Sequence, residues 1–217
     1  DRGGRQLRLS PAGETLLKGL RAAAHQHDET LDAIGALQGL KRGHLKVATV
    51  ESISVTMLPE VLRQFARTYP GIEVSISVAG SEAVTELVRD HAADVGITFN
   101  PPSLDGLETV HTRDYRVGVI MAPGHRLAGR KSLSLKDCEG ERLAWPSRGL
   151  SLRALLDRAF AGKEAVRHPA FECNSLRLMA TLARMGTCIA FQPATGIERD
   201  LADGTLVWIP VADSKLE

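Results

Sequence analysis

The sequence predicts an α/β fold with two lobes that follows one long helix, and three observations support this. From residue 44 onward, short apolar runs alternate with amphipathic segments of helical period, as in βαβ units. A break at Pro123 and Gly124 precedes a second series of the same kind. Upstream, residues 11–39 carry apolar side chains in steps of three and four, over a length that few globular helices reach.

Composition excludes several classes of protein. Hydrophobic residues make up 43% of the 217 residues and charged residues 24%, values that disfavour disordered, collagenous and membrane proteins. Lys and Arg (27) nearly balance Asp and Glu (26), so contact with nucleic acid would need a local basic patch. Three cysteines without a CxxC spacing predict neither a disulfide framework nor a zinc site. With no apolar leader at the N-terminus, we expect a cytoplasmic protein without metal or cofactor.

The first forty residues predict a basic turn, a short strand at residues 6–9 and a long helix. Ser10 and Pro11 supply an N-cap and a first-turn proline, Glu14 favours the helix dipole, and the helix should end near Gly39. Its stripe has the alternating spacing of a coiled-coil seam, in Leu17, Leu20, Ala24, His27, Leu31, Ile34 and Gln38. This spacing favours a dimerisation helix. Packing of the stripe on the chain's own domain is the alternative.

A hinge at Gly39 and Gly43 separates this helix from the first lobe. The elements expected next are strands at 45–50, 73–78 and 95–99, helices at 55–69 and 81–90, and two strands at 107–112 and 115–122. Both helices carry one apolar stripe that can pack on a sheet, so parallel strands with right-handed crossovers follow.

The second half repeats the alternation after the break at Pro123 and Gly124. Its expected elements are strands at 142–145, 170–173, 188–191 and 205–211 and helices at 151–161, 175–185 and 195–201. Two α/β lobes joined through extended strands leave a cleft between them, and such clefts bind small ligands.

Motifs along the whole chain resemble those of the LysR-type transcriptional regulators. Residues 2–14 (RGGRQLRLSPAGE) resemble that family's wing, with Ser10 where the signature has threonine. Resemblance to its effector domain is carried by Leu58-Pro59, Phe65, Tyr69-Pro70-Gly71, Ala93-Asp94-Val95-Gly96-Ile97, Pro123-Gly124-His125-Arg126-Leu127-Ala128, Glu172-Cys173-Asn174-Ser175, Met185-Gly186-Thr187-Cys188-Ile189-Ala190 and Gln192-Pro193. Cys188 departs from the pattern, because the family usually has glycine there.

The resemblance implies a two-lobed, periplasmic-binding-protein-like effector domain, preceded by a long linker helix and the remnant of a winged helix-turn-helix. The implied divisions are 1–13 for the wing remnant, 14–43 for the linker or dimerisation helix with its hinge, and 44–217 for the effector domain, with lobe I at about 44–122 plus 206–217 and lobe II at about 123–205. The recognition helix would precede residue 1, and the family's final strand and helix would follow Glu217. Arg2 and Arg5 would contact the DNA backbone, with solvated surface charges as the alternative.

Polar residues gather where the parallel strands end, the edge at which α/β sheets bind ligands. Ser52 and Ser54 follow the first strand and Ser81 the second, near helix N-termini whose free N–H groups suit a carboxylate. With the resemblance, the expected effector contacts are Ser52, Ile53, Ser54, Ser81, Thr98, Asn100, Ser147, Leu152, Asn174 and Ser175. Helix capping is the alternative for Ser81 and Ser175, and a turn is the alternative for Asn174.

Signatures of enzymes are missing from the sequence. It contains no G-x-S-x-G, G-x-G-x-x-G or H-E-x-x-H, and Arg130 interrupts the one run that approaches a phosphate-binding loop. Cys173 and Cys188 fall in predicted strands, where a buried thiol is more usual than a redox sensor.

We therefore predict a LysR-type regulator and not an enzyme. Its expected partners are DNA, through the full-length parent, a small anionic effector such as a carboxylate or aromatic acid, and further copies of the chain in a homodimer or homotetramer. We expect no membrane contact. A free-standing solute-binding protein is the alternative.

Overall fold

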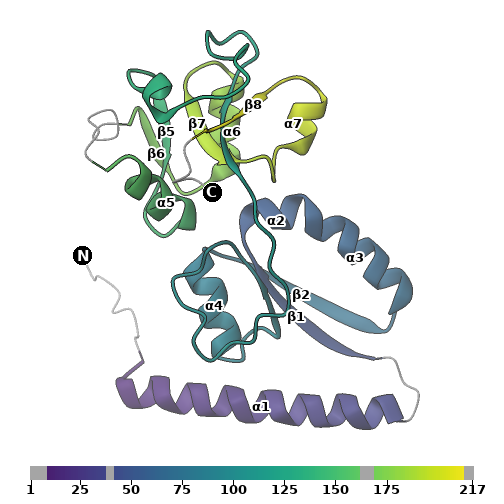
Figure 1. Cartoon of the computed structure of the whole chain (residues 1–217). Helices are drawn as coiled ribbons and strands as arrows, with labels where there is room; N and C mark the ends of the chain where they lie inside the picture. The colour runs from purple at the N-terminus through teal and green to yellow at the C-terminus, as the bar shows by residue number, and fades with distance from the viewer. Residues whose placement is uncertain (1–8, 38–41, 162–168, 213–217) are drawn as a thin grey trace, which may run out of the picture.

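In a computed structural model, two lobes are stacked above one long helix (Figure 1). The structure describes residues 9–37, 42–161 and 169–212, so Arg2, Arg5, the predicted strand at 6–9 and Gln38 lie outside the described residues. Helix α1 (Pro11–Leu37) has the predicted start, where the Gly13 amide donates a hydrogen bond to the Ser10 hydroxyl at 3.1 Å. No helix among these residues is long and apolar enough to cross a membrane.

Lobe I is built on a parallel three-stranded sheet in the order β2-β1-β3. Its elements are β1 (Gly43–Thr49), α2 (Glu51–Val55), α3 (Met57–Thr68), β2 (Ile72–Val78), α4 (Ser81–Arg89) and β3 (Val95–Ile97). The whole length of β1 pairs with β2, and its second half pairs with β3. The buried core is small, with the side chains of Ala48, Val50, Ile53, Leu58, Val84 and Ala93.

The helix expected at 55–69 is preceded by a separate short helix, α2, that the sequence did not predict. Thr56 divides α2 from α3: its hydroxyl donates to the Ser52 carbonyl at 2.7 Å, and its amide donates to the Ile53 carbonyl at 3.3 Å. These bonds close the last turn of α2 and end it. Ser52 and Ser54 therefore lie inside a helix that begins directly after β1.

Lobe II is built on a mixed five-stranded sheet in the order β6-β5-β7-β4-β8. Its elements are β4 (Val117–Met121), η1 (Leu135–Cys138), β5 (Leu143–Pro146), α5 (Ser151–Ala159), β6 (Phe171–Cys173), α6 (Leu176–Arg184), β7 (Ile189–Pro193), α7 (Glu198–Ala202) and β8 (Val207–Pro210). β5 runs parallel to β6 and β7, whereas β4 is antiparallel to β7 and β8.

The strand pairing corrects the expected division between the lobes. We expected residues up to 122, together with 206–217, to belong to lobe I, but β4 and β8 pair with each other inside the lobe II sheet. All five residues of β4 are buried, as expected of an interior strand. Gly118 makes the pairing with β8 possible, because a Cβ atom there would come within 2.3 Å of the Trp208 indole.

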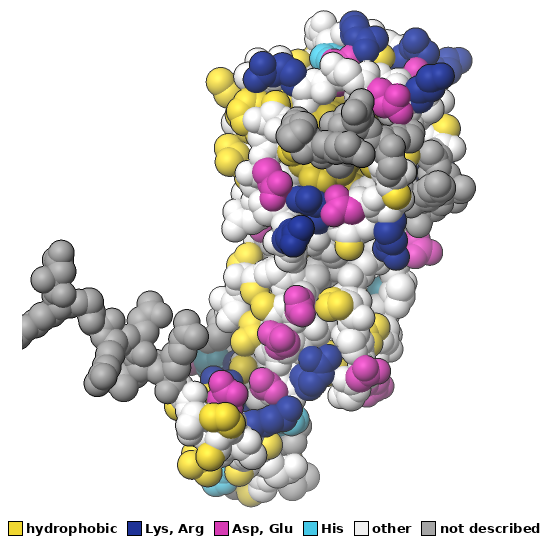
Figure 2. Space-filling model, turned by 90° about the vertical axis from the view of Figure 1, so that its left-hand side faces the viewer, with side chains coloured by type: hydrophobic (Ala, Val, Ile, Leu, Met, Phe, Trp, Pro, Cys, Tyr) yellow, Lys and Arg dark blue, Asp and Glu magenta, His cyan; other side chains and the backbone are white. Residues whose placement is uncertain are grey.

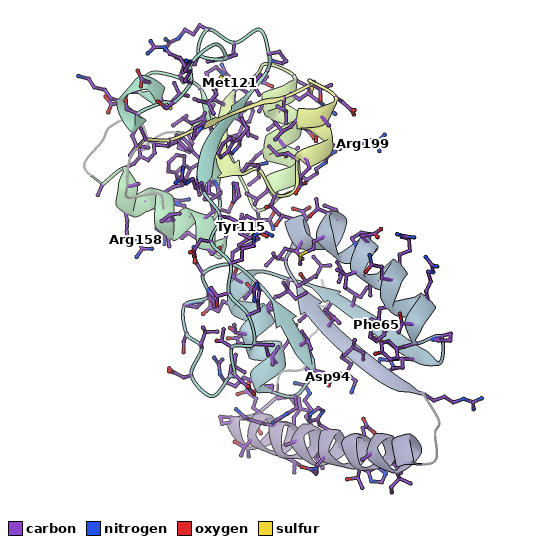
Figure 3. The ribbon with its side chains drawn as sticks, turned by 45° about the vertical axis from the view of Figure 1, so that its right-hand side comes forward. Phe65, Asp94, Tyr115, Met121, Arg158 and Arg199 are labelled. Atoms are coloured by element: carbon purple, nitrogen blue, oxygen red, sulfur yellow. The ribbon has the colours of Figure 1, made fainter. Side chains whose placement is uncertain are left out.

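Both faces of the lobe II sheet are covered. Helix α5 packs on one face, where the rings of Trp145, Phe160 and Phe191 meet edge to face at centroid distances of 5.2 to 5.9 Å. Helix α6 packs on the other face through Met179 and neighbouring alanines. Met121 lies within this lobe (Figure 3).

An extended connector, residues 98–116, joins the lobes. The strand expected at 107–112 does not form; this stretch is polar, and Val110 is 91% exposed. Phe99 and Tyr115, near the two ends of the connector, pack edge to face at 5.6 Å. Tyr115 thus lies between the two lobes (Figure 3).

Candidate functional site

Several cavities lie between the lobes, among them one of about 760 Å³, and two others adjoin each other. The larger of these two has a volume of about 330 Å³ and the smaller about 160 Å³. They share five lining residues, which are Ser52, Phe99, Ser151, Leu152 and Leu176. A single elongated ligand can therefore occupy both.

Four of the described helices begin at the wall of the larger cavity. These are α2 and α4 from lobe I and α5 and α6 from lobe II, whose N-cap residues are Val50, Gly80, Leu150 and Ser175. Of these caps, only Ser175 accepts a hydrogen bond from its own helix, from the Leu178 amide at 3.1 Å. The free N–H groups and the positive ends of the helix dipoles favour a negatively charged ligand group at this place.

Two serines of low exposure line the same cavity. Ser52 is 8% exposed and Ser81 is 5% exposed. Within the described part of the chain, neither hydroxyl has a hydrogen-bond partner. Neither oxygen is among the fully buried side-chain atoms that lack a partner, so both keep accessible surface and can form hydrogen bonds with a ligand.

Glu51 joins the lobes across the cavity. Its carboxylate accepts a hydrogen bond from the Ser175 hydroxyl, which lies 3.1 Å from each carboxylate oxygen. The lobes also approach closely at two glycines: a Cβ on Gly80 would lie 3.2 Å from the Gly149 carbonyl, and one on Gly196 would lie 3.2 Å from Ser52 Cβ. The structure therefore shows the lobes close together at these two glycines as well as at the Glu51 to Ser175 bond.

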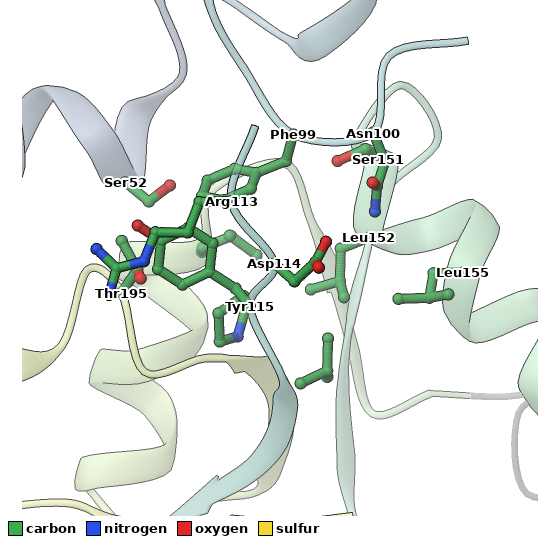
Figure 4. Close-up of a pocket in the computed structure, with 13 residues that line it drawn as sticks. Ser52, Phe99, Asn100, Arg113, Asp114, Tyr115, Ser151, Leu152, Leu155 and Thr195 are labelled. Atoms are coloured by element: carbon green, nitrogen blue, oxygen red, sulfur yellow. The ribbon is translucent and has the colours of Figure 1, made fainter. Parts of the chain in front are cut away.

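The smaller cavity is mainly apolar. Its walls are formed by Phe99, Tyr115, Val117, Leu152, Leu155, Leu176 and Pro193, together with polar residues (Figure 4). Arg113 and Asp114 point to opposite sides of the connector at its rim (Figure 4). The Arg113 guanidinium lies 5.3 Å from the centroid of the Tyr115 ring, a cation–π contact.

The start of α5 is held by a polar cluster behind the cavity. Arg153 donates hydrogen bonds to Asp157 and to the Pro146 carbonyl, and lies 3.3 Å from Glu172. The hydrogen bond that Arg153 donates to the Asp157 carboxylate raises the pKa of Arg153. The Trp145 indole also donates to Asp157 at 3.3 Å. These contacts fix the position of α5 relative to β5 and β6.

Six of the ten expected contact residues line the cavities. Ser52, Ser81, Leu152, Asn174 and Ser175 line the larger cavity, and Asn100 lines the smaller. Ser175 is also the N-cap of α6, as the helix-capping alternative predicts. Ser81 is not the N-cap of α4, because that position is Gly80.

The other four expected residues do not line either cavity. Ile53 is buried in the core of lobe I, and the Ser54 hydroxyl donates to the Glu51 carbonyl at 2.8 Å. The Thr98 hydroxyl is buried without a partner among the described residues. Ser147 bonds to the Cys173 carbonyl through its amide at 2.9 Å.

Sequence reasoning missed several residues of the cavities. Glu51 directly precedes Ser52 at the end of the first strand, so the strand-end rule covers it. Arg113, Asp114 and Tyr115 could not be found in this way, because they come from the connector, whose path depends on both lobes. Gln192 lines a small neighbouring cavity together with Glu51 and Ser52, and its buried side-chain oxygen has no partner among the described residues.

Cys188 is 5% exposed in the core of lobe II, and burial raises the pKa of its thiol to about 11. The thiol is therefore protonated at neutral pH and a poor nucleophile. No group of three His, Cys, Asp or Glu side chains in the described ranges is arranged to hold a metal ion.

Comparison with known proteins identifies the family. A family model described as the LysR substrate binding domain matches residues 38–217. The chain belongs to this family. The LysR-type resemblance of the motifs and the α/β fold are thereby confirmed.

Curated relatives of the chain are named as regulators of transcription. It is 27% identical over 214 residues to a probable nitrogen assimilation transcriptional activator of Synechococcus elongatus, covering 97% of this chain and 69% of the relative. It is 27% identical over 194 residues to the transcriptional activator protein LysR of Escherichia coli, covering 88% and 62%. It is 26% identical over 172 residues to the activator CmpR of Synechocystis, covering 79% and 56%. The chain thus spans 56% to 69% of the length of these relatives.

Solved structures share the fold. The Corynebacterium glutamicum OxyR C206 mutant matches with a TM-score of 0.69 and 23% identity, over 99% of this chain and 68% of that chain. The CcmR regulatory domain of Synechocystis in complex with 2-PG matches with a TM-score of 0.70 and 21% identity, over 78% and 81%. The effector-binding domain of QuiR in complex with shikimate matches with a TM-score of 0.61 and 19% identity, over 79% and 82%.

Proposed function

We propose that this chain is the effector-binding and oligomerising part of a LysR-type transcriptional regulator. The observation that carries the proposal is the larger cavity, where helix N-termini from both lobes converge with the hydroxyls of Ser52 and Ser81, which have no hydrogen-bond partner among the described residues. These groups would bind the carboxylate of a small effector. The names of the relatives and the small molecules bound to two structural neighbours support the same function. Because a regulator of this kind acts on DNA, we propose a cytoplasmic location.

Effector binding would act through the relative position of the lobes. A ligand that contacts Ser52 and Ser81 in lobe I and the start of α6 in lobe II binds best when the lobes are close together. It therefore shifts the population toward that arrangement, in proportion to its difference in affinity for the open and closed states. The wing that the resemblance assigns to residues 1–13 would transmit the change to DNA in the full-length parent.

Exposed side chains on α1 support oligomerisation. Leu20, Leu31 and Ile34 of the predicted seam are 58%, 53% and 48% exposed. Ala24 and His27 are exposed as well, and Leu17 is half-buried. Seen from its end in Figure 2, α1 carries hydrophobic side chains on its outer surface. Such a row at coiled-coil spacing is suited to a partner helix.

The opposite side of α1 contacts lobe I through polar groups. Lys18 lies 3.2 Å from Asp90, and His25 lies 3.4 Å from Asp94 and 5.1 Å, between ring centroids, from His91. These contacts orient the helix on its own lobe and leave the apolar row available for a second copy of the chain.

A thermal-shift screen with small carboxylates tests the effector site. A ligand at a hundredfold excess over its Kd should stabilise the folded state by about 2.7 kcal/mol. The double variant Ser52→Ala/Ser81→Ala should lose this stabilisation. The matched control is Ser77→Ala/Ser132→Ala, two exposed serines that line neither cavity. An equal shift in both double variants would contradict the proposed site.

Sizing chromatography tests the oligomer. We expect Leu20→Glu/Leu31→Glu to elute as a monomer at concentrations where the unchanged chain elutes as an oligomer, because charges at seam positions repel across a coiled coil. A monomeric elution of the unchanged chain would contradict the role of α1.

A further inference from the structure

We propose that the effector is a zwitterion, an α-amino acid or close analogue with an apolar side chain, whose ammonium group binds the Glu51 carboxylate. Its own carboxylate would meet the N-terminus of α4 at Ser81 and the Ser52 hydroxyl. The inference rests on the proposed function, because it specifies the ligand class of the same cavity.

Glu51 is the charged residue of the larger cavity. Every other described residue that lines this cavity is apolar or neutral. Glu51 is half-buried, and none of the ion pairs within the described ranges includes it. Its side chain has one hydrogen-bond partner there, the Ser175 hydroxyl. Since a carboxylate can accept about four hydrogen bonds, most of its capacity is left for a ligand.

The cavity therefore has features that favour a negatively charged ligand group and one that disfavours it. The beginnings of the three nine-residue helices α4, α5 and α6 favour a negative group, while the Glu51 carboxylate repels one. A simple carboxylic acid would place two like charges in one small, partly buried space. An α-amino acid carries an ammonium and a carboxylate on the same carbon atom. It can satisfy Glu51 and the helix N-termini together.

The smaller cavity indicates the nature of the ligand's side chain. It opens from the larger one at Phe99, Leu152 and Leu176, and its walls are mainly aliphatic and aromatic. The charges at its rim, Arg113 and Asp114, are exposed and therefore screened by water and salt. An apolar or aromatic side chain matches this environment best.

Glu51 also has a structural role, and one substitution separates the two roles. Glu51→Gln keeps an oxygen that can accept the hydrogen bond from Ser175 but removes the negative charge. Glu198→Gln is the matched control. It neutralises a carboxylate that lines a neighbouring cavity with Glu51 but not the larger cavity, and glutamine can keep its bond from the Gly196 amide.

Calorimetric titration of the 217-residue chain with matched ligands tests the proposal. The probes are phenylalanine, leucine, isoleucine, valine and methionine, each paired with the acid that lacks the amino group, such as 3-phenylpropanoate for phenylalanine. We expect at least one amino acid to bind at least tenfold more tightly than its partner acid. In Glu51→Gln that preference should fall at least tenfold, whereas Glu198→Gln should keep it.

The outcomes separate this inference from the proposed function. Partner acids that bind as well as the amino acids, and lose binding in Ser52→Ala/Ser81→Ala, would overturn the zwitterion and leave the effector site intact. Failure of all five amino acids to bind would also overturn it. An unchanged preference in Glu51→Gln would overturn the role of Glu51. Binding that is indifferent to the Ser52 and Ser81 substitutions would instead contradict the proposed function.

Discussion

Lobe I and lobe II are both α/β layers around a sheet, but they bury very different numbers of apolar side chains. The core of lobe I consists of six buried residues behind three strands. Lobe II has clusters of sixteen and nine buried residues on the two faces of five strands. In lobe I, Val61 of α3 and Ile76 and Val78 of β2 are 50%, 42% and 55% exposed. Lobe II therefore has the larger core of its own, and lobe I is the lobe whose stability would increase more when its exposed apolar side chains are covered by a partner.

The largest loss of stability is expected when the side chain at the centre of the lobe II core is truncated. Trp145 is fully buried between Phe160 and Phe191, so Trp145→Ala should lower the free energy of unfolding by about 4 kcal/mol. Urea denaturation followed by circular dichroism measures the change. A loss below about 1 kcal/mol would mean that the cluster is not the main stabilising element, since large aromatic truncations normally cost more.

A matched truncation in lobe I should cost less. Leu58 is 3% exposed in the small core, and Leu58→Ala should lower the unfolding free energy by about 2 to 3 kcal/mol, near the low end for leucine, because the thin core can relax around the space. Leu156→Ala, in the lobe II core, is the control with the same chemical change. Equal losses in the two variants would contradict the unequal packing of the lobes.

Alkaline pH should weaken lobe II through Cys188. The pKa of this thiol is raised from 9.0 to about 11 in the folded state by burial. Below pH 9 the thiol is protonated in both states, and its contribution is constant. Between pH 9 and 11 the unfolded state loses the proton first, so the unfolding free energy should fall by about 2 kcal/mol. Urea titrations at pH 8, 9.5 and 11 should show this extra fall in the unchanged chain but not in Cys188→Ala.

The smallest effect is expected where α1 meets lobe I. Lys18 and Asp90 lie 3.2 Å apart, with side chains 59% and 39% exposed. Lys18→Ala should therefore change the unfolding free energy by less than about 1 kcal/mol. The difference should shrink further at 1 M salt because screening weakens exposed pairs. A large, salt-independent loss would indicate that α1 is an integral part of lobe I.

Local pattern was sufficient to predict two α/β lobes, although not the division between them, and many of the residues that line the cavity. Strands β1 and β2, helices α4 and α5, and the positions of Ser52 and Ser81 follow from alternation and from the rule for strand ends. What local pattern could not supply is pairing between distant segments. The assignment of β4 and β8 to one sheet depends on Gly118 making room for Trp208. Similarly, the Glu51 carboxylate accepts a hydrogen bond from Ser175, which lies 124 positions away in the sequence.

The positions of the two tryptophans have a consequence for spectroscopy. Trp145 and Trp208 are the only tryptophans of the chain, and both lie in strands of the lobe II sheet. Tryptophan emission therefore reports on lobe II alone, whereas ellipticity reports on the helices of both lobes. If lobe I unfolds first, the ellipticity curve will move to lower urea than the emission curve. Tryptophan fluorescence therefore follows the unfolding of lobe II, whereas lobe I contains no tryptophan and is not detected by it.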